Sequence, residues 1–184
     1  MHVLALAEYL LATMLAWYPA SGHDFTRVPR AETEARYAAI AHDLATVASD
    51  PLEAPLFEGA DGRAQTALLM LSFAGYESGG FAAKVDQPTA SGDGGHAWCL
   101  CQVHMPFARG IVDRPSCFRA GFRAMRASRE MCGGLRSVAD RLTGYTVGRC
   151  LHDEPGALLR VGRAMRWWGD HPLQIALPEA FRSR

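Results

Sequence analysis

The sequence is short of lysine, carries no net charge and contains no apolar run long enough to cross a membrane. Lys84 is its only lysine, and all other basic residues are arginines. The 19 basic and 19 acidic residues cancel, so bulk charge gives no reason to expect a nucleic acid as partner. Hydrophobic residues make up 49% and charged residues 21% of the 184 residues, which excludes a disordered chain. We therefore expect one globular domain, or one domain with an additional arm.

The N-terminal stretch MHVLALAEYLLATMLAWYP lacks the features of a secretory signal and of a membrane span. No lysine or arginine precedes its apolar part, Glu8 interrupts that part, and the whole is too short for a bilayer. We interpret it as a helix that faces the core and ends before Pro19. With no signal peptide, the protein is expected to be made in the cytoplasm.

The two parts of the chain carry opposite charge. Residues 1–95 contain 5 basic and 12 acidic residues, whereas the remainder contains 14 basic and 7 acidic residues. Four arginines of the second part, Arg119, Arg123, Arg126 and Arg129, follow one another at intervals of three or four residues. Such a stripe is typical of a solvated helix face, and it would also suit docking to an anionic polymer.

The cysteines leave two interpretations open. There are five, so one stays unpaired if disulfides form. The spacing of Cys117, Cys132 and Cys150 would let them connect two helices in an oxidising compartment. Buried free thiols in a reducing compartment fit the sequence equally well.

Helical spacing of apolar residues predicts a mainly α-helical fold. Beyond the N-terminal helix, the predicted helices are 34–48, 64–77, 116–131, 135–147 and 155–168. In 34–48 the apolar stripe is Tyr37, Ile40, Leu44 and Val47. Segments 18–32 and 50–62 are rich in turn-forming residues and are interpreted as irregular connections. There is no alternation of strands and helices, which argues against a doubly wound sheet.

The helix at 64–77 is apolar on every side, which is typical of a central, fully surrounded helix. Asp61 is the predicted N-cap and Gly79 the predicted residue at its end. The glycines and Pro88 of segment 85–98 predict turns and a short hairpin directly after this helix. The expected fold is therefore helical, with a small β excursion after the central helix.

Glu77 lies where this apolar helix ends, before Ser78 and two glycines. A carboxyl group there loses part of its hydration, which raises its pKa, and the negative end of the helix dipole disfavours the carboxylate further. An acid kept protonated near neutral pH can donate its proton to a leaving oxygen, as cleavage of a glycosidic bond requires. The alternative is an ordinary solvated glutamate at a helix end.

The stretch ALLMLSFAGYESGGF followed by GDGGHAWCLCQV resembles the catalytic core of the lysozyme-like lytic transglycosylases, the peptidoglycan-cleaving enzymes of bacteria and phages. In that family a helix ends in Glu-Ser-Gly, a stretch Gly-x-Ala-x-Gly-Leu-Met-Gln follows, and a later helix carries Tyr-Asn-x-Gly. This chain has Glu77-Ser78-Gly79, then Ala97-Trp98-Cys99-Leu100-Cys101-Gln102, then Tyr145-Thr146-Val147-Gly148. The resemblance covers about residues 64–168.

The resemblance implies a lysozyme-like catalytic domain at 56–184, preceded by a helical arm and linker at 1–55. It implies that Glu77 is the catalytic acid and base, with Ser78, Gln102 and Tyr145 lining the saccharide cleft. Trp98 lies within the motif and is a candidate for stacking on a sugar ring, whereas Trp167 and Trp168 are expected to pack in the core. The chain departs from the pattern where Cys99 replaces glycine, Cys101 replaces methionine and Thr146 replaces asparagine.

The implied reaction cleaves the β-1,4 bond between N-acetylmuramic acid and N-acetylglucosamine and gives 1,6-anhydro ends. A muramidase that hydrolyses the same bond would need a second carboxylate, for which Asp86 and Asp93 are candidates. Asp93 in GDGG also fits a plain Asp-Gly turn. The expected partner is the peptidoglycan strand, bound by a monomer without cofactor or metal. Action in the periplasm or cell wall would then require a holin, a virion or a secretion system for delivery.

Three other readings compete with this one. His96, Cys99, Cys101 and His104 form a cluster of potential zinc ligands, although its spacing is unlike that of structural zinc sites. A cysteine peptidase would use Cys99 or Cys101 with His104 or His152. A degenerate lysozyme-like domain would bind glycan without cutting it, or would be a structural part of a virion or secretion machine.

Overall fold

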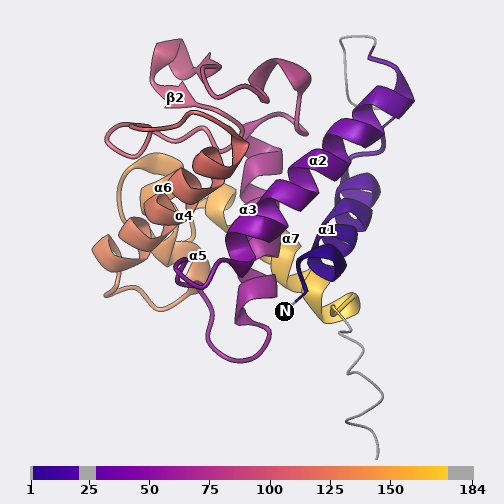
Figure 1. Ribbon diagram of the computed structural model, residues 1–184. Helices are drawn as coiled ribbons and strands as arrows, with labels where there is room; N and C mark the ends of the chain where they lie inside the picture. The colour runs from indigo at the N-terminus through magenta and orange to yellow at the C-terminus, as the bar shows by residue number, and fades with distance from the viewer. Residues whose placement is uncertain (1, 21–27, 174–184) are drawn as a thin grey trace, which may run out of the picture.

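A computed structural model of the chain describes residues 2–20 and 28–173 (Figure 1). Within them the fold is mainly helical, with one small antiparallel sheet, which confirms the predicted class. The helices are α1 (Val3–Trp17), α2 (Arg30–Ser49), α3 (Gly62–Glu77), α4 (Arg114–Met131), α5 (Val138–Arg141), α6 (Thr143–Val147) and α7 (Pro155–Asp170). The strands β1 (Ser91–Gly92) and β2 (Ala97–Trp98) form the predicted hairpin after α3. No helix of the described part has both the length and the apolar character needed to cross a bilayer.

Helix α3 is the central helix, as its composition predicts. All residues from Thr66 to Gly75 are buried, because other helices surround this stretch on every side. Figure 1 shows α3 between α1 and α2 on one side and α4 and α6 on the other, with α7 behind. Near its carboxyl end, α3 contacts α6 through Phe73 and Tyr145 and α7 through Glu77 and Arg160.

The two ends of α3 are stabilised in different ways. Asp61 is the N-cap residue of α3, as predicted, but its side chain makes no capping bond. The hydroxyl of Thr66 instead donates to Gly62 O and accepts from Leu56 N at 2.8 Å, tying the preceding segment to the first turn. At the other end Gly79 has φ +65°, and Gly80 N donates to Gly75 O at 2.7 Å. This is a Schellman ending, and it confirms the role predicted for Gly79.

Helices α1 and α2 pack against each other and against α3. Leu6, Leu10 and Met14 of α1 are fully buried, and so is the whole predicted stripe of α2: Tyr37, Ile40, Leu44 and Val47. These residues belong to the same hydrophobic cluster as the residues of α3, α4 and α7. The predicted boundary near residue 55 therefore falls inside one continuous core.

The tryptophans of α7 pack against α1, in line with the expected core role. Trp167 meets Trp17 edge-on with ring centroids 5.7 Å apart, and Trp168 meets Tyr9 at 6.0 Å. Arg163 lies over the ring of Trp17 at 4.3 Å and donates to Tyr18 Oη at 2.7 Å. These contacts hold the end of α1 on α7 and so fix the position of the helix that faces Glu77.

The segment predicted as one helix at 135–147 is two short helices, α5 and α6. Polar side chains interrupt it because they bind backbone groups that a continuous helix would use. Ser137 accepts from Asp140 N at 3.0 Å, and the Thr143 hydroxyl donates to Asp140 O at 2.7 Å. The resulting corner turns Tyr145 of α6 toward α3, whose Phe73 ring it meets edge-on.

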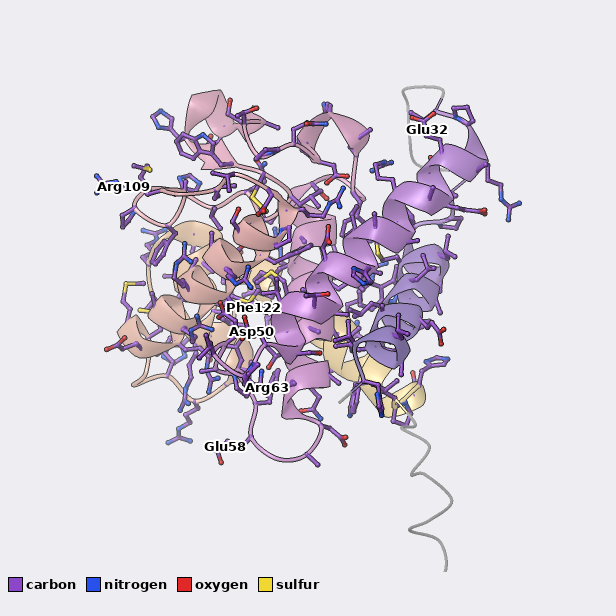
Figure 2. The ribbon with its side chains drawn as sticks, in the orientation of Figure 1. Glu32, Asp50, Glu58, Arg63, Arg109 and Phe122 are labelled. Carbon is purple, nitrogen blue, oxygen red and sulfur yellow. A yellow bond between two sulfur atoms is a disulfide. The ribbon has the colours of Figure 1, made fainter. Side chains whose placement is uncertain are left out.

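Basic residues of the second part of the chain form ion pairs with acidic residues of the first part. Arg119 pairs with Asp50 at 3.1 Å and Arg126 pairs with Glu53 at 3.0 Å, while Arg129 donates to Leu56 O. Figure 2 shows Asp50 beside the labelled Arg63, which also donates to backbone carbonyls of this segment. Three arginines of the stripe thus clamp residues 50–56 to α4, so the stripe is neither a free docking face nor simply solvated.

Two disulfides flank the hairpin and α4. Cys99 is bonded to Cys117 and Cys132 to Cys150, while Cys101 is a buried free thiol. The interpretation with all thiols free is therefore wrong for four of the five cysteines. Cys132–Cys150 joins the end of α4 to the segment after α6, and Cys99–Cys117 joins the turn after β2 to the start of α4.

Candidate active site

A cavity of about 580 Å³ opens between the hairpin, α4 and α6. Its volume falls in the range of sites that hold small molecules or parts of polymers. Its polar lining residues are Asp93, Gln102, His104, Ser128, Tyr145 and Thr146, and its apolar ones include Val103, Met105, Phe107, Met131 and Val147. Three of the residues predicted for the site, Asp93, Gln102 and Tyr145, therefore lie together around one space.

Glu77 is not one of the residues that line this cavity, but it interacts with two of them. Its side chain is 22% exposed, and it interacts electrostatically with His104 and Tyr145, which do line the cavity. Burial raises the pKa of Glu77, and the guanidinium of Arg160 opposes this without cancelling it. The half-buried acid expected from the sequence is present, but it has a cationic partner that the sequence did not reveal.

Arg160 of α7 is that partner, with Nη2 at 2.9 Å from Glu77 Oε1. Its guanidinium lies over the rings of Tyr76 at 5.2 Å and Phe73 at 5.8 Å, and Ser72 Oγ donates to its carbonyl at 2.8 Å. Sequence reasoning missed Arg160 because nothing near it in the chain points to α3. The signal that was available is an arginine on the apolar face of an amphipathic helix, where a buried cation requires a partner.

Gln102 is held in place by the turn that contains it. Its Nε2 donates to Cys99 O at 2.7 Å, and its backbone has φ +45°. The side-chain oxygen of Gln102 lies so close above Gly92 of β1 that any Cβ at position 92 would collide with it. Gly92 therefore provides the space in which the amide of Gln102 reaches the cavity.

Tyr145 forms part of the cavity wall through its ring. Its hydroxyl donates to Cys101 O at 2.5 Å, and its ring meets Phe73 edge-on with centroids 5.3 Å apart. Burial raises the pKa of Tyr145 well above the ordinary value. The hydroxyl therefore links α6 to the turn after β2 and stays protonated.

Ser78 and Trp98 do not line the cavity. Ser78 is only 4% exposed, and its hydroxyl donates to Ala74 O at 2.6 Å and accepts from Phe81 N at 2.8 Å. Both hydrogen bonds serve the end of α3, so Ser78 supports the position of Glu77 and has no free hydroxyl for a sugar. Trp98 is half-buried in β2 and pairs with Val103, which does line the cavity.

The two candidate second carboxylates are in different environments. Asp86 is held by Arg114 through two bonds of 2.8 and 3.0 Å and borders a separate cavity of about 350 Å³. Asp93 lines the same cavity as Gln102 and is 73% exposed, with Oδ2 at 3.9 Å from His104 Nε2. Of the two, only Asp93 lines the cavity that also contains Gln102 and Tyr145.

The state of Cys99 and Cys101 argues against both the zinc-site and the cysteine-peptidase hypotheses. Cys99 is bonded to Cys117, so it offers neither a thiolate ligand nor a nucleophile. Cys101 is fully buried, and burial raises the pKa of its thiol. His152 lies elsewhere, with Nδ1 at 3.4 Å from Asp140 Oδ2. Within residues 2–20 and 28–173 no group of three metal-binding side chains comes together.

Thr146, which replaces the asparagine of the resembled motif, lines the cavity and connects it to α7. Its hydroxyl lies 3.1 Å from the carboxylate of Glu154, the residue that caps α7.

Comparison of the chain with protein-family models, curated proteins and solved structures found no match. The candidate site therefore consists of Glu77 with Arg160 on one side and the cavity with Asp93, Gln102, Tyr145 and Thr146 on the other.

Proposed function

We propose that the protein is a peptidoglycan lytic transglycosylase of lysozyme-like fold and that Glu77 is its acid and base. The observation that carries this proposal is the position of Glu77. Its half-buried carboxyl group ends a buried helix, has a raised pKa and interacts with residues that line a 580 Å³ cavity. A protonated carboxyl next to a space of this size suits the transfer of a proton to a bridging sugar oxygen.

The proposed reaction needs no second reactant. Glu77 donates its proton to the oxygen between C1 of N-acetylmuramic acid and C4 of N-acetylglucosamine, and the C1–O bond breaks. The resulting carboxylate takes the proton of the 6-hydroxyl of the muramic acid ring, whose oxygen bonds to C1. The products are a 4-hydroxyl end and a 1,6-anhydro end, and Glu77 is protonated again.

The cavity residues have separate roles in this proposal. The amide of Gln102 is fixed by its bond to Cys99 O, so it can orient a sugar hydroxyl or N-acetyl group with little loss of entropy. Tyr145 lines the cavity and interacts electrostatically with Glu77. The apolar side, with Met105, Met131 and Val147, suits the methyl groups of N-acetyl and lactyl substituents.

Hydrolysis of the same bond is the second candidate, and the position of Asp93 favours it. Asp93 lines the cavity and is exposed enough to activate a water molecule. Hydrolysis would leave reducing ends in place of anhydro ends. A glycan-binding or structural role in a virion or secretion machine is the non-enzymatic alternative, and it would leave the glycan uncut.

The test is to digest purified peptidoglycan with the protein and to analyse the released muropeptides by mass spectrometry. Transglycosylation gives products lighter by one water than those of hydrolysis, and binding without cleavage gives no soluble products. If reducing ends are found, the protein is a hydrolase, with Asp93 as the second carboxylate.

We also propose that the protein acts as a monomer on the cell wall and reaches it through a holin, a virion or a secretion system.

A further inference from the structure

Arg160 lies near two carboxylates of different origin. Its Nη2 is 2.9 Å from Glu77 Oε1 at the end of α3. On the other side, a Cβ built on Gly156 would lie 2.6 Å from Arg160 Nη1 and 3.0 Å from Glu154 Oε1. The guanidinium of Arg160 and the carboxylate of Glu154 therefore both lie beside the backbone of Gly156, where a Cβ would make one or both of them shift. The charge of Arg160 acts on Glu154 across this short space.

Glu154 is built to stay ionised. Burial alone would raise its pKa, but the N–H groups of Gly156 at 2.9 Å and Ala157 at 2.6 Å bind the carboxylate. The hydroxyl of Thr146 and the charge of Arg160 act in the same direction, and the net effect lowers the pKa. The carboxylate also lies at the N-terminus of α7, where the helix dipole favours negative charge.

The electrostatic surroundings of Glu77 favour the protonated form, unlike those of Glu154. It lies at the C-terminal end of α3, where the dipole disfavours a carboxylate, and burial is the largest influence on its pKa. Two carboxyl groups that interact with one guanidinium in such different surroundings divide their roles, and the one with the higher pKa takes up the proton. Here that group is Glu77.

We propose that Glu154 is a positioning residue that acts through Arg160, and that the two residues together let Glu77 change its protonation state. The inference rests on the proposed function, because only an acid that cycles between its two forms needs such an arrangement. If Arg160 had Glu77 as its only partner, protonation of Glu77 would leave a buried guanidinium without a counter-charge. With Glu154 ionised beside it, Arg160 keeps an anionic neighbour in both states of Glu77.

The other groups around Glu77 and Arg160 do not provide this counter-charge. Within the described part of the chain, His104, Cys101 and Tyr145 are further titratable groups that interact with Glu77. A histidine adds positive charge or none, and burial keeps the thiol and the phenol neutral. Tyr18 and Tyr76 adjoin Arg160, and burial raises the pKa of Tyr18 as well. Glu154 is thus the second anion of the cluster.

The experiment is a carboxyl-detected NMR titration of protein labelled with 13C at the glutamate carboxyl carbon. The Glu77 signal is assigned by its loss in E77Q. Removing the negative charge in E154Q should lower the pKa of Glu77 by about one unit, and removing the positive charge in R160Q should raise it by about one unit. Glutamine at position 154 keeps one side-chain oxygen that can accept a capping bond, and E154S provides a second neutral cap should E154Q fold poorly.

The matched controls are E130Q on the exposed end of α4 and R166Q on the exposed side of α7. Both should leave the Glu77 titration unchanged. Shifts of the same sign in E154Q and R160Q, or no shift in E154Q and E154S, would overturn the inference. The titration does not depend on lytic activity, so it is separate from the test of the proposed function, which is the loss of lysis in E77Q.

Discussion

Glu77 at the end of α3 and Arg160 in the second turn of α7 form an ion pair of 2.9 Å. Two serine hydroxyls hold the backbone around this pair. Ser72 donates to the carbonyl of Arg160 and so joins α3 to α7, and Ser78 donates to Ala74 O within the last turn of α3. Burial and the ion pair act on the pKa of Glu77 in opposite directions. Burial favours the protonated acid, whereas the guanidinium favours the carboxylate. A group balanced in this way can both give and take a proton.

The pH dependence of lysis follows from the raised pKa of Glu77. The first step needs the protonated form, so kcat/KM should fall as the pH rises through the pKa of Glu77. Because this pKa lies above the usual value for glutamate, activity should persist at a higher pH than an exposed glutamate would allow. Initial rates of lysis between about pH 4 and pH 9 measure this. A rate that rises steadily with pH would indicate that Glu77 acts only as a base.

Gly92→Ala should weaken glycan binding with little loss of stability. A Cβ at position 92 collides with Oε1 of Gln102 and forces the amide away from its bond with Cys99 O. The backbone at Gly92 has φ −115°, which alanine adopts without strain. We expect KM to rise about tenfold, equivalent to about 1.4 kcal/mol, with Tm nearly unchanged. Gln102→Ala should reproduce the effect, and an unchanged KM in both variants would remove Gln102 from the site.

Loss of the Cys132–Cys150 disulfide should lower the free energy of unfolding. The bond closes a loop with a sequence separation of 18 residues, for which the chain-entropy estimate is about 3 kcal/mol. The variant in which both cysteines are replaced by serine is compared with the wild type by denaturant unfolding under oxidising conditions. The same comparison in reducing buffer should give a much smaller difference. Equal stability of the two oxidised proteins would contradict the prediction.

Arg114→Gln should destabilise the fold without touching the cavity beside Glu77. Arg114 bonds Asp86, whose side chain is only 5% exposed, and also pairs with Asp43 at 2.5 Å. Its removal leaves the buried carboxylate of Asp86 without a cation, at a cost of about 2 kcal/mol or more. Urea unfolding measures the loss. Arg109→Gln serves as control, since Arg109 lies at the outer edge of the protein in Figure 2, and it should change stability little.

Much of the fold follows from local sequence patterns. The apolar stripe of α2, the all-round apolar α3 and the glycine after it were predicted because each depends on residues close together in the chain. The break between α5 and α6 was missed, since the bond of the Thr143 hydroxyl to Asp140 O competes with an otherwise helical pattern.

The site was predictable only in part for the same physical reason. Glu77, Gln102 and Tyr145 could be found because motifs carry them, whereas Arg160 and Glu154 reach the site through the packing of α7 on α3. Ser78 has a motif position, yet its hydroxyl is used by the helix end. The arginine stripe of α4 gave no local sign that its partners lie in residues 50–56.

The most direct test of the central claim is the lytic activity of E77Q on purified peptidoglycan, followed by loss of turbidity. Glutamine keeps the shape of the protonated acid but has no proton to give, so lysis should disappear. Since the raised pKa means that ionised Glu77 costs stability once the pH exceeds that pKa, the Tm of E77Q at neutral pH should equal or exceed that of the wild type. E130Q should lyse like the wild type. Full lysis by a folded E77Q would contradict the claim that Glu77 is the acid.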